Sequence, residues 1–279
     1  MTASCNPAEV PLKFGPSPTV CTRPVTMLGS RIQQSSHRPW PLPSGPWTMA
    51  QQWCDLLFAH WPIPAAAMRA FVPPALKLDT YDRQAWIGVV PFHMRNVRPR
   101  ALPAVPWLSH FAELNVRTYV TAADGSRPGV WFFSLDAANP VAVMLARRFF
   151  MLPYFNAAMD VRTVGDAVYY SSRRTHAGAA PAHFMARYRP TGPVYHAAPG
   201  TLEQWLTERY ALYTIDRRGR PVIGEIDHVP WPLQPAEAEI EINDIVGASG
   251  LGLPDSPPLL HFARRLDVHI WPIKRVTTG

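Results

Sequence analysis

Lysine is scarce in this sequence, although the chain as a whole is basic. Lys and Arg number 27 against 20 Asp and Glu, which gives a formal net charge of +7. Only Lys13, Lys77 and Lys274 are lysines, so 27 − 3 = 24 of the basic residues are arginine. These arginines are scattered among alanines and prolines and form no stripe of the kind that follows nucleic-acid phosphates. We therefore expect no nucleic-acid partner despite the charge.

Cysteine and long hydrophobic runs are also rare. The three cysteines, Cys5, Cys21 and Cys54, form neither a CxxC pair nor a disulfide ladder, which favours a reducing compartment. The first thirty residues lack the continuous apolar core of a signal peptide. No apolar run approaches the roughly 20 residues that span a bilayer. These absences predict a cytoplasmic protein with no membrane partner.

Motifs for several kinds of chemistry are missing. There is no HExxH, the ten histidines are spread singly, and no GxSxG elbow occurs. The glycine-rich segment 247–252 (GASGLG) comes late in the chain without a βαβ context, so a loop explains it better than a phosphate site. The sequence predicts no metal site and no cofactor.

What the chain does contain is an ordinary globular composition, with 47% hydrophobic and 17% charged residues, enough to bury a sizeable core. Residues 1–46 are rich in Pro, Ser and Thr and show little hydrophobic periodicity. They are interpreted as a disordered leader, or as an overextended start before a true beginning near Met49. Residues 47–279 are predicted to form a single domain.

Hydrophobic patterning in this domain indicates a series of strands and three helices. Strands are predicted near 52–61, 84–94, 111–121, 129–137, 156–164, 167–175, 183–189, 222–229, 237–242 and 261–273. Helices are predicted at 64–71, at 141–150 after Asn139-Pro140, and at 202–210, where Thr201 and Gln204 have capping-box spacing. Such a series predicts a mainly β, largely antiparallel barrel or sandwich with a few short helices.

One predicted strand, 111–121, carries a row of polar residues. Side chains alternate across a strand, so Glu113, Asn115, Arg117 and Tyr119 share one face, opposite a mostly apolar face. A solvated sheet face explains this pattern. In a closed barrel the same row would instead line the interior and form a ligand pocket.

Further polar residues lie on neighbouring segments. Asp136 ends the next strand, Arg147 lies on the following helix, and Tyr154 follows that helix. Together with Glu113 and Arg117 they could form one site, but surface salt bridges explain the four charges equally well. Arg173 and Arg174 are equally ambiguous. His60, between Ala59 and Trp61, suits a hydrogen-bonded core residue better than a catalyst.

Several blocks of the sequence resemble those of YqjF-like bacterial proteins. They are QWCDLLFAHWP (52–62), FVPPALKLD (71–79), ELNVRTYV (113–120), GVWFFSLDA (129–137) and ARRFFMLPY (146–154). That group is similar in turn to acetoacetate decarboxylase, whose Val-Pro…Leu…Asp pattern is matched by residues 72–79. The resemblance implies an acetoacetate decarboxylase-like closed antiparallel β-barrel with a ligand cavity, commonly assembled into homo-oligomers.

The chain departs from the decarboxylase where that enzyme's chemistry resides. The decarboxylase has a proline followed by two lysines after its arginine-bearing helix, and one lysine forms a Schiff base. Here the corresponding run is Pro153, Tyr154, Phe155, and Gly88 aligns with a cavity glutamate. The resemblance therefore implies a protein without Schiff-base decarboxylase activity.

Three functions remain open. The first is an enzyme of lyase or hydrolase type acting on a small carboxylate or keto compound. In it Glu113 or Asp136 moves a proton, Tyr154 donates to a developing oxyanion, and Arg117 or Arg147 clamps a carboxylate beside Asn115. The second is a non-catalytic barrel that binds a small molecule. The third is a structural protein whose barrel is filled by its own side chains.

Overall fold

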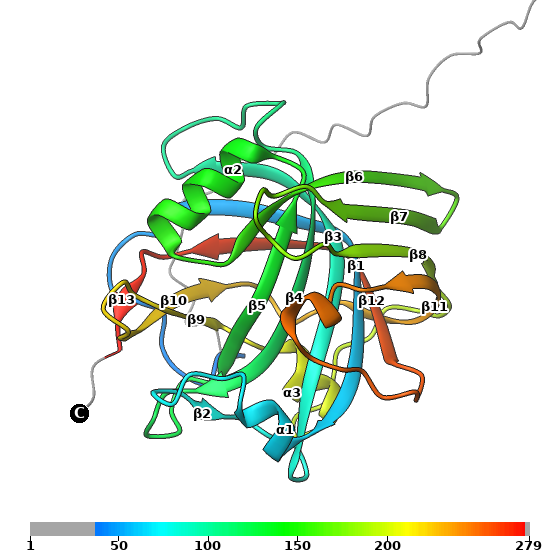
Figure 1. The fold of residues 1–279 in the computed structure, drawn as a ribbon. Coiled ribbons are helices and arrows are strands. Elements are labelled where there is room, and N and C mark those ends of the chain that lie inside the picture. Colours follow the sequence, from blue (N-terminus) through cyan, green and yellow to red (C-terminus); the bar gives the residue numbers. More distant parts are fainter. Residues whose placement is uncertain (1–36, 277–279) are drawn as a thin grey trace, which may run out of the picture. The chain divides into compact units, whose positions relative to one another are not determined.

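A computed structural model describes residues 37–276 of the chain (Figure 1). Thirteen strands and a few short helices make up this region. The strands are β1 (Met49–Pro64), β2 (Lys77–Leu78), β3 (Gln84–Pro99), β4 (Phe111–Thr121), β5 (Gly129–Ala137), β6 (Tyr154–Val164), β7 (Ala167–Arg174), β8 (His183–Pro190), β9 (Ala211–Ile215), β10 (Pro221–Asp227), β11 (Leu233–Asn243), β12 (Leu259–Ile270) and β13 (Lys274–Arg275). The helices are α1 (Ala65–Arg69), α2 (Pro140–Leu145), the π-helix η1 (Ala146–Phe150), α3 (Leu202–Thr207) and the 3-10 helix η2 (Gly247–Ser249).

The sheet closes on itself. Strand pairing runs β4–β5–β6–β7–β8–β11–β12–β1–β3 and returns to β4, which makes a nine-strand barrel. A second route joins β5 to β12 through β9 and β10. The curved strands β1, β3, β4, β5 and β12 are therefore shared by two closed rings (Figure 1).

Because the shared strands face a closed ring on each side, both of their faces are buried over much of their length. All eleven residues of β4 are buried. Ala112, Leu114 and Val116 face a cluster with Tyr170 and Phe184, which we call the packed half. The other face looks onto a second cluster, which we call the cavity half and which includes Phe58, Phe92, Leu135, Ile226 and Trp231.

The connection from β5 to β6 is a helical crossover, as their parallel pairing requires. Asn139 begins α2 by accepting hydrogen bonds from the amides of Val141 and Ala142, at 3.0 and 3.1 Å, with Pro140 in the first turn. The helix continues into η1 and ends at Met151, which has a left-handed φ of 53°. This crossover covers one end of the cavity half.

The predicted closed barrel is confirmed, and most predicted elements lie where the pattern placed them. The bounds of β4 and β5 agree with the predicted strands, whereas β1 and β3 are longer. The third helix is shorter than predicted, ending at Thr207 rather than residue 210. The prediction missed β9, which pairs in parallel with β5 through Val130 and Leu212. In the described part of the chain, no helix is both long and apolar enough to span a membrane.

The predicted leader falls largely outside the described residues, which begin at His37. The last part of the predicted leader is packed against the domain. The side chain of Arg38 is buried, hydrogen bonds to the backbone of Ile226 and forms ion pairs with Glu225 and Asp227. Trp40 also donates to Glu225, at 3.0 Å. Contacts with the barrel thus start before residue 47.

Candidate functional site

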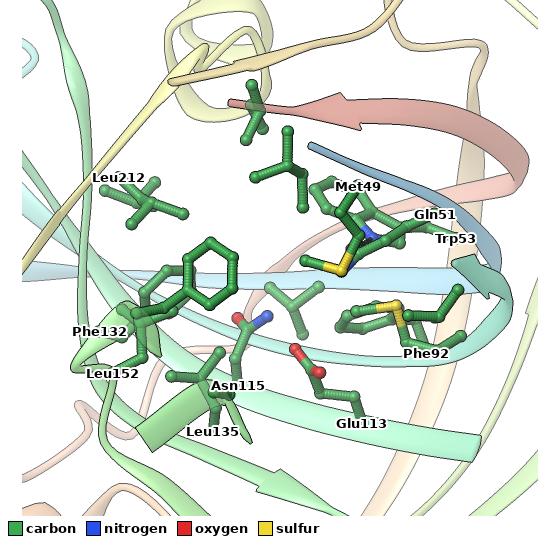
Figure 2. Close-up of a pocket in the computed structure, with 18 of the residues that line it drawn as sticks. Met49, Gln51, Trp53, Phe92, Glu113, Asn115, Phe132, Leu135, Leu152 and Leu212 are labelled. Carbon is green, nitrogen blue, oxygen red and sulfur yellow. Dashed lines mark hydrogen bonds between the residues drawn. The ribbon is translucent and has the colours of Figure 1, made fainter. Parts of the chain in front are cut away.

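The cavity half encloses a space of about 250 Å³. Its walls come from the shared strands, from β9 and β10, and from the crossover α2–η1. Most of the lining is aliphatic or aromatic, for example Phe92, Phe132, Leu135 and Leu212 (Figure 2). A concave, mainly apolar space with a few polar groups is typical of small-molecule sites.

Three of the four members of the polar row of β4 face this cavity, and Tyr119 does not line it. Glu113, Asn115 and Arg117 all line it, and Figure 2 shows the polar ends of Glu113 and Asn115 pointing into the space. The register accounts for their position, because Glu113 pairs with Phe92 and Asn115 with Val90, two residues of the same lining. The carbonyl oxygen of the Asn115 side chain is buried and has no hydrogen-bond partner among the described residues.

Arg117 is the least compensated charge in the cavity. Its residue is 8% exposed, and its guanidinium carbon lies 5.3 Å from the centre of the Phe58 ring and 5.9 Å from that of Tyr119. Within residues 37–276 it forms no salt bridge, and its Nε is buried without a hydrogen-bond partner. A buried guanidinium without an anion is costly, which marks the position as one that can accept an anion.

Gly88 on β3 makes room for this arrangement. It pairs with both His60 and Arg117, and a Cβ atom there would lie 3.0 Å from the His60 ring and 3.5 Å from Cγ of Arg117. His60 is the hydrogen-bonded core residue that the sequence favoured, with its Nε2 2.6 Å from the hydroxyl of Tyr119. Burial, together with the nearby Arg117 charge, lowers the pKa of His60 well below its ordinary value, so the ring is neutral.

A second guanidinium, that of Arg209, also lies over the ring of Tyr119. Its carbon is 4.8 Å from the centre of that ring, and its Nη1 is 2.6 Å from a carboxylate oxygen of Asp79. Its Nη2 is buried and has no partner in the described chain. Sequence reasoning missed this residue, because its partner Asp79 lies 130 positions away. No local signal separated it from the other scattered arginines.

Glu113 and Tyr154 form a buried pair at another point of the lining. The Tyr154 hydroxyl donates to Oε2 of Glu113 at 2.9 Å, and the Tyr170 hydroxyl donates to the Glu113 backbone carbonyl at 2.7 Å. Burial raises the pKa of Glu113 to about 8, and the hydrogen bond from Tyr154 only partly opposes this. The carboxyl group is therefore mostly protonated at neutral pH and can donate a hydrogen bond into the cavity.

Two of the predicted site residues lie away from this cavity. Asp136 projects from the opposite face of β5, because Leu135 faces the lining, and it pairs with Arg174 through Nε at 3.0 Å and Nη2 at 2.7 Å. Arg147 is exposed on η1, and its Nη1 donates to the backbone carbonyl of Tyr154 at 2.6 Å. Their geometry therefore assigns Asp136 to a buried ion pair and Arg147 to an anchor of the crossover.

The two lysines in the described part of the chain, Lys77 and Lys274, do not line the cavity either. None of the lining residues in the described chain is lysine. Lys77 is exposed on β2, and Lys274 on β13 lies 2.5 Å from Glu225. Across residues 37–276 no three His, Cys, Asp or Glu side chains gather closely enough to hold a metal ion. That the protein needs no cofactor stays a prediction.

The barrel resembles several solved structures at low sequence identity. Acetoacetate decarboxylase from Legionella pneumophila is 14% identical, with a TM-score of 0.55 over 90% of this chain and 98% of that one. An acetoacetate decarboxylase-like enzyme from Sphingomonas wittichii RW1 is 13% identical, with a TM-score of 0.53 over 84% and 94%. The enduracididine biosynthesis enzyme MppR complexed with pyruvate is 12% identical, with a TM-score of 0.52 over 85% and 92%. At these identities the likeness establishes the fold alone.

Sequence comparison gives the family. The uncharacterized protein YqjF of Bacillus subtilis (strain 168) is 48% identical over 234 residues, which are 84% of this chain and 95% of that protein. The family model DUF2071, described as an uncharacterized conserved protein, matches residues 50–267. The chain therefore belongs to the DUF2071 family of YqjF-like proteins, folded as an acetoacetate decarboxylase-like β-barrel.

Proposed function

We propose that this protein binds a small organic monocarboxylate with an apolar body in the cavity, with the carboxylate held by Arg117. The observation that carries the proposal is the buried guanidinium of Arg117, which no acidic side chain of the described chain neutralises. A guanidinium fork matches the geometry of a carboxylate and can donate two parallel hydrogen bonds to it.

The net charge of the groups around Arg117 favours a ligand with a single negative charge. Arg117 and Arg209 contribute two positive charges, and Asp79 neutralises one of them at 2.6 Å. Glu113 adds almost no charge at neutral pH, because its pKa is about 8. One positive charge remains, and it is matched by one carboxylate.

Size and polarity narrow the ligand further. The cavity of about 250 Å³ lies just below the range typical of small-molecule sites, which favours a small compound. The protonated carboxyl group of Glu113 offers a hydrogen bond to a carbonyl oxygen, which favours a keto acid. MppR, which shares the fold, was solved with the keto acid pyruvate, and this supports the same class by analogy.

Calorimetric titration with a panel of 2- and 3-keto acids and saturated monocarboxylates tests the binding proposal. We expect the acids to bind and their amides to fail. Arg117→Met should weaken binding at least about thirtyfold, since breaking a buried charge pair costs on the order of 2–5 kcal/mol. Arg162→Met, which alters an exposed arginine on β6, is the matched control and should bind as the wild type does. Equal affinity for acids and amides would contradict the proposal.

A second candidate function is catalysis on the same ligand. It is favoured by the Glu113–Tyr154 pair, because a carboxyl group with a pKa near neutral can give and take a proton. Glu113 would be the proton donor of a lyase- or hydrolase-type reaction that uses no lysine. Proton NMR of each ligand during incubation tests this. Product formation that is lost in Glu113→Gln, while binding is kept, would support catalysis. Ligand recovered unchanged throughout the panel would show that the protein binds these compounds without catalysing a reaction.

A further inference from the structure

Exposed apolar side chains gather around the mouth of the cavity. Six of the eleven large hydrophobic residues that are exposed in the described chain lie on two segments, the loop 100–110 between β3 and β4 and the crossover α2–η1. Trp107 is 69% exposed and Phe149 is 61% exposed. The remaining five are spread over other segments. We call the six residues the mouth face: Leu102, Val105, Trp107, Met144, Leu145 and Phe149.

The two segments form one surface. The side-chain amide of Asn139 donates to the backbone carbonyl of Trp107 at 3.1 Å and so ties the loop to the start of α2. Leu108 and Leu145 line the same cavity from the two segments. Figure 1 shows the loop between β3 and β4 arching beside α2. Leu145, which is 39% exposed, belongs both to the lining and to the mouth face, so the cavity opens there.

The two segments that carry the mouth face, with their flanking residues, are charged with one sign only. Residues 95–110 and 138–155 contain five arginines and no Asp or Glu. Arg100 and Arg148 are exposed, and their guanidinium carbons lie 5.5 Å from the Trp47 ring and 5.6 Å from the Phe149 ring. One cationic group therefore lies beside the exposed ring of Phe149, and another beside the half-buried ring of Trp47. The five arginines are Arg95, Arg98, Arg100, Arg147 and Arg148.

We propose that the mouth face docks on an anionic lipid surface. Apolar side chains enter the boundary between headgroups and acyl chains, aromatic residues are favoured at that depth, and each arginine near an anionic leaflet adds attraction. A second copy of the chain fits less well, because a two-fold contact would bring one arginine-rich face against the other. The earlier expectation of no membrane partner rested on the absence of a spanning segment, which has no bearing on docking at a surface.

Docking in this orientation brings the cavity mouth to the lipid. An amphiphilic carboxylate could then pass between the acyl layer and Arg117 without crossing bulk water. The docking itself does not depend on what the cavity binds, so it stands or fails separately from the proposed function.

Co-sedimentation of the full chain with vesicles tests the proposal. One set is pure phosphatidylcholine, and the other contains about one-third phosphatidylglycerol. We expect binding to the anionic vesicles at least tenfold stronger than to the neutral ones, and weakening as added salt screens the charges. Equal binding to both sets, or no binding to either, would overturn the proposal.

Paired variants identify the surface responsible. Trp107→Ser with Phe149→Ser removes two exposed aromatic groups and should lower partitioning at least tenfold. The matched control is Val164→Ser with Val229→Ser, at positions 65% and 62% exposed on other segments, and it should bind as the wild type does. Because all four positions are exposed, circular dichroism should show unchanged folding.

Two further double variants, each removing two arginines, test the contribution of charge to docking. Arg100→Gln with Arg148→Gln should lower partitioning on anionic vesicles about fivefold for each arginine removed. Arg162→Gln with Arg189→Gln removes the same charge from exposed ion pairs on β6 and β8 and should have little effect. Light scattering tests whether a second copy of the chain occupies the mouth face instead of lipid. An oligomer of the wild type that Trp107→Ser with Phe149→Ser dissociates would assign the face to a second copy and overturn the proposal.

Discussion

On one face of β4, Ala112, Leu114 and Val116 meet Tyr170 and Phe184 from β7 and β8, and the space between the sheets is filled. On the other face, the polar row meets a wall made by β9 and β10, where the lining side chains include Ala211, Leu212 and Ile226. The same strand thus serves a solid core and a cavity. The difference comes from the opposite wall, because aromatic rings fill the packed half and shorter side chains leave the cavity half open. On β4 the charged residues, Glu113 and Arg117, both lie on the face toward the cavity.

The largest expected effect comes from removing an aromatic ring in each half. Phe184 is fully buried in the packed half, so Phe184→Ala should lower the unfolding free energy by about 4 kcal/mol, combining lost burial with a new void. Phe132 is half-buried and borders an existing cavity, so Phe132→Ala should cost only about 1–2 kcal/mol. Urea unfolding of both variants measures the difference. Equal losses would show that the two halves are packed alike.

The next effect separates two buried arginines. Asp136→Asn removes the carboxylate that pairs with Arg174 and should cost about 3 kcal/mol, because it leaves a buried charge alone. Arg117 already lacks such a partner among the described residues, so Arg117→Met should leave stability unchanged or raise it by up to about 1 kcal/mol. A large loss of stability in Arg117→Met would mean that its charge is compensated within the folded protein.

A third prediction uses the pH dependence of stability. Glu113 has an ordinary pKa of 4.5, which burial raises to about 8 in the folded protein. Between these values the folded state holds a proton that the unfolded chain has released, so the contribution of Glu113 to the unfolding free energy falls as pH rises. The contribution is about 1.4 kcal/mol per pH unit at most, and it levels off above pH 8. The histidines contribute equally to both proteins, so the unfolding free energy of the wild type minus that of Glu113→Gln, measured with urea from pH 5 to 9, should fall up to about pH 8. A difference that does not change with pH would place the pKa of Glu113 near its ordinary value.

The sequence predicted the features of β4 that depend on local pattern, and it could not predict those that depend on contacts with distant strands. Alternation along residues 111–121 placed Glu113, Asn115 and Arg117 on one face, because the period of a strand is local. The pattern could not decide between solvent and an enclosed face, since that depends on which strands lie opposite. The five-residue strand β9, which completes the cavity wall, followed a predicted helix and carries little pattern of its own.

The differences between the predicted and the observed surroundings of the site residues have the same origin. Asp136 and Arg147 were grouped with the polar row because they lie on neighbouring elements, but nearness in sequence does not set the face on which a side chain emerges. Arg209 was missed because its place beside Tyr119 depends on Asp79, far away in the chain. Contacts of this kind follow from strand order and register, which a single sequence does not reveal.

The smallest expected effect concerns the one glycine on which the polar end of the cavity depends. Gly88→Ala would bring a methyl group within 3.0 Å of the His60 ring, which cannot retreat easily because its Nε2 is hydrogen bonded to Tyr119 at 2.6 Å. We expect a loss of about 1 kcal/mol, at the lower end for overpacking, because Arg117 on the other side borders open space. Ala112→Val, on the packed face of the same sheet, is the comparison and should cost about 3 kcal/mol, because its neighbours are fixed. If urea unfolding gave the two variants equal losses, the cavity half would be as rigid as the packed half, and the space beside Arg117 would not be available to a ligand.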